Sequence, residues 1–245
     1  PNRGDCLSLV GLARDLSDFY EFNLEIDFYE GEIDTLNLNF VNLSSSACPK
    51  ISFLEIELES TKTVNKYKNY MEDFFNNLDV KKNNFFTDIS NYVSYELGQP
   101  THCFDSNKIC GPLVFEEKKC NKSFKTLLDT DITLQDKNCI FINNDEIISL
   151  AGVMGGKSTA CSDSTNKVLI ECAFFNPESI IGKSVKYGLK SDAAHKFERG
   201  VDINSQERTL RRFLKIVDDH AEIKSFKIIS FESDTYKNKE LDINL

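Results

Sequence analysis

The chain has 245 residues, of which 40% are hydrophobic and 28% are charged, and its formal net charge is −10. This length and composition are typical of a globular protein with one large domain or two small ones. Tight binding of a long nucleic acid depends on clustered Lys and Arg. The acidic balance therefore argues against a protein that binds a long duplex by itself, although it permits binding of one nucleic-acid end.

The sequence has no membrane-targeting pattern and no pair of closely spaced cysteines. No apolar run is long enough to cross a bilayer, and no signal peptide pattern heads the chain. None of the eight cysteines belongs to a CxxC pair, which argues against a zinc ribbon or a thioredoxin-type site. We therefore expect a cytoplasmic protein with reduced cysteines and no contact with a membrane.

The first third of the chain predicts two helices and a strand. Asp5 is placed to cap a helix over residues 6–20, whose apolar side would contain Leu7, Val10, Leu16 and Phe19. Alternation from Ile51 to Leu58 predicts a strand. An aromatic stripe at helical spacing predicts a helix over residues 63–78, and such a stripe is typical of a core.

The segment from Asp88 to Asp105 predicts a short helix followed by a sharp exit. Asp88 is a candidate N-cap, Gly98 is placed to end the helix in a left-handed conformation, and Pro100 forces the preceding residue into an extended one. His102 would then lie on a stiff exit loop, where its near-neutral pKa suits chemistry. The alternative is a surface turn that happens to contain a histidine.

The second half of the chain predicts a mainly antiparallel sheet region. Strands are expected near 113–118, 123–128, 139–143, 146–153 and 167–175, with turn residues over 143–145 that imply a hairpin. A helix is expected to start at Pro177, behind an Asn176 cap, and to end near Gly188. A second helix is expected over 204–219, followed by a last strand from Ile223 to Phe231. The pattern predicts an α+β fold with mainly antiparallel or mixed sheets and flanking helices.

Glu171 interrupts the apolar run Val168 to Phe175, which reads VLIECAFF. A strand that is apolar at nearly every position is expected to be buried on both faces. A buried, unpaired carboxylate costs several kcal/mol, so Glu171 must have either partners or a purpose. A structural salt bridge and a functional site remain open from this pattern alone.

Two other segments combine small residues with polar ones. The glycine turn with Gly152, Gly155 and Gly156 either lets backbone N–H groups approach a ligand or is a plain hairpin turn. It does not complete a phosphate-binding loop, because Ala151 stands where that motif needs glycine.

The segment Ser191 to Gly200 reads SDAAHKFERG, and we expect its His195 to form a structural hydrogen bond. The chain has three histidines and none shows H-x-x-x-H or H-x-H spacing, so a metal site is disfavoured.

At this point the residues resemble a known family, the editing module formed by the paired third and fourth domains of the bacterial phenylalanyl-tRNA synthetase beta subunit. The resemblance starts at NRGDCLSLVGLAR (Asn2 to Arg14) and continues through CPK, DISNYVSYELGQPTHCFD, SLAGVMGG, VLIECAFF and YGLKSDAAHKFERGVD, in the family's order. It implies the family's layered sandwich, with an editing domain of two packed subdomains over residues 1–235 and a linker or tail over 236–245.

The resemblance also implies roles for single residues. Glu171 matches the position that recognises a tyrosine hydroxyl, and His102 the histidine near the ester and the terminal adenosine. The positions that match the remainder of the pocket are Ser191 and Ala193, the glycines Gly152 and Gly155, and Asn91. The implied reaction is hydrolysis of tyrosine mischarged onto phenylalanine tRNA, by direct attack of water, without a covalent intermediate or a metal.

The resemblance implies no cofactor for this domain, since ATP and magnesium would serve only the full synthetase. The implied partners are the 3′ end of phenylalanine tRNA, the synthetase alpha subunit and the remaining beta-subunit domains. Two alternatives stay open. One is a non-catalytic RNA-binding or structural module, and the other is a metal-dependent hydrolase.

Overall fold

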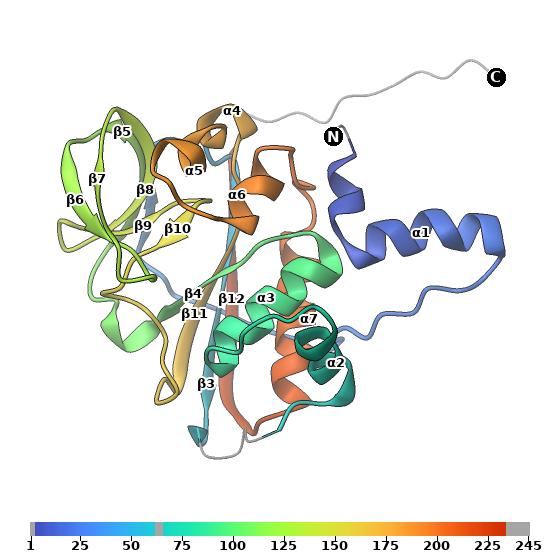
Figure 1. The fold of residues 1–245 in the computed structure, drawn as a ribbon. Coiled ribbons are helices and arrows are strands. Elements are labelled where there is room, and N and C mark those ends of the chain that lie inside the picture. Colours follow the sequence, from blue (N-terminus) through green and yellow to red (C-terminus); the bar gives the residue numbers. More distant parts are fainter. Residues whose placement is uncertain (1–2, 62–65, 234–245) are drawn as a thin grey trace.

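In the computed structural model, residues 3–61 and 66–233 are described (Figure 1). The central sheet has the strand order β1-β12-β3-β11-β4, that is Asp34–Thr35, Ile223–Glu232, Lys50–Leu58, Lys167–Phe174 and His102–Asp105. The second sheet has the order β10-β9-β8-β5-β2, that is Met154–Gly155, Glu146–Leu150, Lys137–Asn143, Leu113–Lys119 and Phe40–Asn42. The pairs β1–β12 and β2–β5 are parallel and the other pairs in both sheets are antiparallel, so the predicted α+β fold with mixed sheets is confirmed.

The helices lie mainly in two groups, one beside each of the two sheets. On one side are α2 (Asn69–Asn77), α3 (Phe85–Leu97) and α7 (Gln206–Asp218), as Figure 1 shows. Beside the second sheet lie α4 (Pro177–Ile180), α5 (Lys183–Lys186) and α6 (Asp192–Phe197). The other described elements are η1 (Gly4–Leu7), α1 (Leu9–Tyr20), η3 (Ser106–Lys108) and a small hairpin of β6 (Lys122–Lys125) and β7 (Asp131–Leu134).

Strand β11 is buried on both of its faces, as its apolar sequence predicted. Val168, Ile170 and Cys172 belong to the core shared with the helices, whereas Leu169 and Ala173 belong to the core between the two sheets. Because side chains alternate along a strand, Glu171 points to the same side as Leu169 and Ala173. The central sheet therefore directs this carboxyl toward the second sheet.

The helix α3 begins earlier than the sequence predicted. Asn84 is the N-cap and its side chain accepts a hydrogen bond from the Thr87 N–H, while Asp88 is buried in the first turn. The Asp88 carboxylate instead accepts bonds from the Tyr67 hydroxyl and the Asn83 N–H. The predicted C-cap is confirmed, because Gly98 adopts a φ of 79° at the helix end.

The N-terminal prediction was partly wrong. A short η1 turn precedes α1, and Ser8 rather than Asp5 caps α1 by accepting a bond from the Gly11 N–H. Asp5 forms ion pairs with Arg3 and Arg14 instead. The apolar side of α1 does not face the core, since Leu16 is 50% exposed and Phe19 is 78% exposed.

The remaining predicted elements differ mainly at their ends. The helix expected over 63–78 is observed as α2, and residues 63–65 of that prediction lie outside the described residues. Gly182, with a φ of 77°, separates α4 from α5, so the single helix expected up to Gly188 is two short ones. Strand β7 was not predicted. The hairpin turn at 143–145, helix α7 and strand β12 are confirmed, whereas the tail expected at 236–245 lies outside the described residues.

Candidate functional site

A small cavity of about 60 Å³ opens where β4, β11, the β9–β10 turn and helix α6 meet. Its lining residues are Pro100, Thr101, His102, Ser149, Leu150, Gly152, Val153, Met154, Gly155, Glu171, Ala193 and Phe197. We call this cavity the slot. Five of the seven site residues predicted from the sequence line it: His102, Gly152, Gly155, Glu171 and Ala193.

His102 and Glu171 are direct neighbours on adjacent strands. The two residues are register partners in the antiparallel β4–β11 pair, so their side chains project from the same face of the sheet. His102 was expected on a loop, but it is the first residue of β4, because Pro100 and the segment after it extend into the sheet. The imidazole ring packs edge-on against Phe104 with ring centroids 4.4 Å apart.

The Glu171 carboxyl is 4% exposed, and among the described residues it has neither a hydrogen bond nor an ion pair. The salt bridge left open by the sequence is therefore absent from that part of the chain. Desolvation by burial raises the pKa of Glu171 to about 8. A carboxyl with this pKa is mainly protonated at pH 7.

Burial lowers the pKa of His102, whereas it raises the pKa of Glu171. Desolvation lowers the pKa of His102 to about 4, because the charged imidazolium is the form that burial disfavours. The ring is therefore neutral at pH 7, with one nitrogen that can donate a hydrogen bond and one that can accept. The slot thus presents a neutral imidazole beside a neutral carboxyl, both without polar partners in the described ranges.

The glycine turn is fitted closely to the slot. A Cβ atom at Gly155 would lie 2.2 Å from His102 Cε1, so only glycine leaves room for the imidazole ring. Gly152 has a φ of 71°, in the left-handed region that favours glycine. The backbone N–H of Gly156 is already bonded to the Ile148 carbonyl at 2.9 Å, so this amide is not free for a ligand.

Helix α6 positions the small-residue wall of the slot. Ser191 caps α6 by accepting a bond from the Ala194 N–H, and its hydroxyl donates to the Val153 carbonyl at 2.6 Å. Ser191 thereby ties α6 to the glycine turn without lining the slot, whereas Ala193 lines it. The His195 side chain is exposed and forms no hydrogen bond with any described residue, so the structural bond expected of it was wrong.

Asn91 lies apart from the other predicted site residues. It is exposed on α3 and does not line the slot. The sequence reading in turn missed Ser149, which is 3% exposed, lines the slot and pairs in register with Gly155. The signal available was a serine that directly precedes the glycine turn in an otherwise apolar strand.

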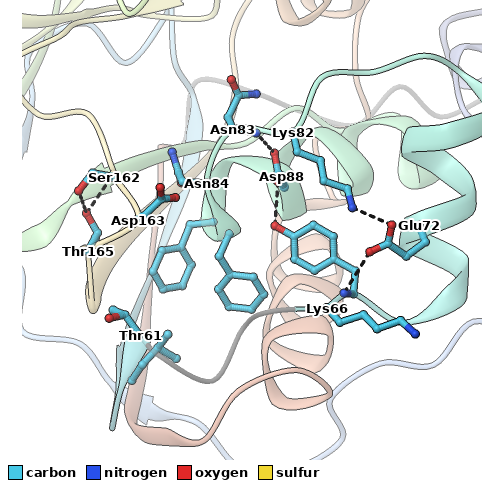
Figure 2. A pocket seen from close by; sticks show the side chains of 14 residues that line it. Thr61, Lys66, Glu72, Lys82, Asn83, Asn84, Asp88, Ser162, Asp163 and Thr165 are labelled. Atoms are coloured by element: carbon cyan, nitrogen blue, oxygen red, sulfur yellow. Dashed lines mark hydrogen bonds and ion pairs between the residues drawn. The ribbon is translucent and has the colours of Figure 1, made fainter.

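A larger cavity of about 430 Å³ lies on the helical side of the central sheet (Figure 2). Its polar groups are largely occupied with one another. Figure 2 shows Lys82 directed at Glu72 and Asn83 directed at Asp88. The Lys82–Glu72 hydrogen bond measures 2.7 Å, and Asp88 also accepts a bond from the Tyr67 hydroxyl. The buried Asp88 carboxylate is thus already satisfied, and the described lining of this cavity does not show the unpaired buried carboxyl that marks the slot.

Within the described residues, no group of three or more His, Cys, Asp and Glu side chains is arranged to hold a metal ion. A membrane-spanning helix is also not found in this part of the chain, where each helix is too short or too polar. All eight cysteines are free thiols.

Comparisons with known proteins agree on one family. The model of the B3/4 domain matches residues 52–222. The chain is 30% identical, over its whole length, to the phenylalanine–tRNA ligase beta subunit of Psychrobacter arcticus, of which it covers 31%. Over 89% of its length it is 32% identical to the corresponding subunit of Neisseria gonorrhoeae, of which it covers 28%. The chain thus spans about a third of the length of these curated relatives.

A solved structure supports the same fold. An N-terminal fragment of the phenylalanyl-tRNA synthetase beta subunit from Pyrococcus horikoshii matches 93% of the chain, with 60% of that fragment covered, a TM-score of 0.50 and 13% sequence identity. At this identity the match concerns the fold alone.

Proposed function

Because the chain belongs to the B3/4 domain family and is homologous over its whole length to the phenylalanine–tRNA ligase beta subunit, we propose that it is an editing domain that hydrolyses the ester of tyrosine mischarged onto phenylalanine tRNA. The slot is the proposed binding site for the amino-acid side chain. Helix α6 contributes Ala193 and Phe197 to its wall, and Glu171 and His102 are its neighbouring titratable groups.

The observation that carries this proposal is the unpartnered, buried carboxyl of Glu171. A synthetic pocket made for phenylalanine rejects an added hydroxyl by only about 100-fold, whereas a site built to bind that hydroxyl discriminates strongly. In the proposed complex, the tyrosine hydroxyl exchanges hydrogen bonds with the Glu171 carboxyl. Phenylalanine would leave the same carboxyl buried and unpaired, which costs about 1–3 kcal/mol.

The proposed reaction needs only a positioned water. The water oxygen bonds to the ester carbonyl carbon, the bond to the ribose oxygen breaks, and a proton from the water passes to that oxygen. The products are free tyrosine and tRNA with a restored hydroxyl. The neutral imidazole of His102, which lines the slot, is proposed to orient the ester or the water by hydrogen bonding.

The partners follow from the same proposal. The substrate is the 3′ end of phenylalanine tRNA, and the alpha subunit and further beta-subunit domains of a ligase would deliver it. No cofactor is proposed for this domain, and ATP and magnesium would serve only aminoacylation by a full ligase. The eight free thiols support a reducing compartment such as the cytoplasm.

The test is deacylation of tyrosyl-tRNA and phenylalanyl-tRNA, both made with phenylalanine tRNA, measured in parallel. We expect the unaltered chain to hydrolyse the tyrosyl ester faster. Glu171→Ala should reduce the tyrosine/phenylalanine ratio by about 5- to 150-fold, the equivalent of about 1–3 kcal/mol, because phenylalanine would no longer leave a buried carboxyl unpaired. Glu222→Ala, which removes an exposed carboxylate, is the matched control and should leave the ratio unchanged.

An unchanged ratio in a folded Glu171→Ala variant would remove Glu171 from the discrimination. Binding of the tRNA end without hydrolysis by the unaltered chain would favour a non-catalytic RNA-binding module. Loss of hydrolysis on treatment with a chelator would favour a metal-dependent hydrolase.

A further inference from the structure

Helix α6 forms one wall of the slot and is too short to hold its position by itself. It contributes Ala193 and Phe197 to the lining of the slot and spans only six residues, whereas helices shorter than about 12–15 residues are marginal in isolation. The start of α6 is tied to the glycine turn, because the Ser191 hydroxyl donates to the Val153 carbonyl at 2.6 Å. The other end of the helix needs a second attachment if this wall is to keep its place.

Lys196 provides the second attachment. Its ammonium group donates to the Leu7 carbonyl at 2.8 Å and to the Ser94 carbonyl at 2.6 Å. Leu7 belongs to η1 and Ser94 to the last turn of α3, so one side chain ties α6 to two further elements. In Figure 1, α6 lies between β10 and the blue N-terminal segment. The wall of the slot is thus fastened on both sides.

The Lys196 ammonium is a partly buried cation that forms no ion pair with a described carboxylate. Desolvation lowers its pKa to about 8, so at pH 7 the group is still mainly charged. The Ser94 carbonyl lies at the C-terminal end of α3, where the helix dipole favours a cation. An apolar side chain would fill the same space without the cost of desolvation, so the benefit of a lysine lies in the two hydrogen bonds that it donates.

Lys196 does not line the slot, but it lies beside the residues that do. Successive residues of an α-helix are about 100° apart around the axis, so Lys196 is about 60° from Ala193 and about 100° from Phe197. Because α6 is a single short helix, a displacement of Lys196 moves both of these side chains with it.

We propose that Lys196 is a positioning residue of the slot, which holds α6 at the distance from the β4–β11 pair at which its wall contacts the amino-acid side chain of the substrate. This inference rests on the proposed function, because it concerns the same binding site. Lys196 itself does not touch the substrate. Loss of its hydrogen bonds loosens the apolar wall, whereas the carboxyl that receives the tyrosine hydroxyl stays in place on β11.

Lys196→Met tests the proposal, because methionine keeps an apolar stem and loses every donor. We expect the KM for tyrosyl-tRNA made with phenylalanine tRNA to rise about tenfold, since an apolar contact the size of one methylene is worth at least about that factor. The tyrosine/phenylalanine ratio of kcat/KM should change by less than about threefold, because Glu171 is unaltered. A purely structural role would lower the active fraction, and with it kcat, but would leave KM unchanged.

Two further variants serve as controls. Lys196→Arg keeps the charge and the donors, so its KM should lie within about twofold of that of the unaltered chain. Lys190→Met removes an exposed lysine just before α6 that has no hydrogen bond or ion pair with a described residue, and it should leave KM unchanged. Circular dichroism checks the folding of each variant. Should Lys196→Met not fold, Lys196→Gln takes its place, and its uncharged amide should raise KM by about threefold.

Three results would overturn the proposal while the proposed function stands. The first is an unchanged KM in folded Lys196→Met, and the second is a KM for Lys196→Arg as high as that for Lys196→Met. The third is a tyrosine/phenylalanine ratio that falls as far as in Glu171→Ala, which would make Lys196 part of hydroxyl recognition. Equal hydrolysis of the two esters by the unaltered chain would instead overturn the proposed function, and this inference with it.

Discussion

Two buried glutamates lie on opposite sides of the central sheet and differ in what surrounds them. Glu96, among the helices, accepts bonds from Arg212 at 2.6 and 2.8 Å and from the Tyr92 hydroxyl at 2.9 Å. Glu171, in the slot, has no such partner among the described residues. Burial alone therefore does not identify a functional carboxyl. The missing partner is what distinguishes Glu171, because the fold satisfies Glu96 and gives the Glu171 carboxyl no described partner, which supports the proposed contact with a ligand.

The largest expected effect comes from changing the paired glutamate. Glu96→Gln removes the charge opposite Arg212, which is itself buried, and breaking such a pair costs about 3–5 kcal/mol. Glu171→Gln is the matched change, and at pH 7 it should alter the free energy of unfolding by less than about 1 kcal/mol, since the carboxyl is already mainly protonated. Urea unfolding measures both. Equal destabilisation by the two changes would contradict the comparison.

The next largest effect is expected from a change in the glycine turn of the slot. Gly155→Ala would force a methyl group against the His102 ring, and overpacking of this kind costs about 1–3 kcal/mol. We expect tyrosyl-tRNA hydrolysis to fall by about tenfold, because the imidazole must move.

A double-mutant cycle on stability provides the control. His102→Ala removes the ring that the new methyl group meets, so Gly155→Ala should destabilise the His102→Ala protein less than the unaltered one. Strict additivity of the two free-energy changes would show that Gly155 and His102 do not share this contact.

The smallest effect is the change of stability between pH 7 and pH 8. The pKa of Glu171 is about 8 in the folded chain and about 4.5 when unfolded, so between these values only the folded chain holds the proton. The free energy of unfolding should therefore fall as the pH rises through this window. His102 has a lowered pKa and acts in the opposite sense, but only at pH values below about 6.5.

The pH range from 7 to 8 isolates the contribution of Glu171. Over this unit the unaltered chain should lose about 1 kcal/mol more than Glu171→Gln, measured by urea unfolding at each pH. Identical slopes for the two proteins would mean that the carboxyl is already ionised or already paired.

The sequence predicted which segments form strands and which residues line the slot better than it predicted which residues are neighbours across the sheet. The apolar run from Val168 to Phe175 specified a strand buried on both faces, whereas the lone Glu171 in it left a salt bridge and a functional site open. The register that places His102 beside Glu171 joins segments 69 residues apart, and no local pattern encodes such a pairing.

The helix predictions failed where local signals compete. Asp5 and Ser8 are both good caps, and the fold uses Ser8 because Asp5 is held by Arg3 and Arg14. Periodicity located the apolar side of α1, but it could not show that this side lacks a partner in the described part of the chain. The same limit applies to Ser149, whose importance appears only when β9 is placed beside Gly155.

The pairing of β4 with β11 also constrains how this protein can change by mutation. His102 and Glu171 face the slot because two strands are held in one register, and neighbouring residues alternate between opposite faces. A single-residue deletion just before His102 would turn the imidazole toward the helices and present Cys103 to the slot. Insertions and deletions in this strand are thus expected to be lost from populations that need the site.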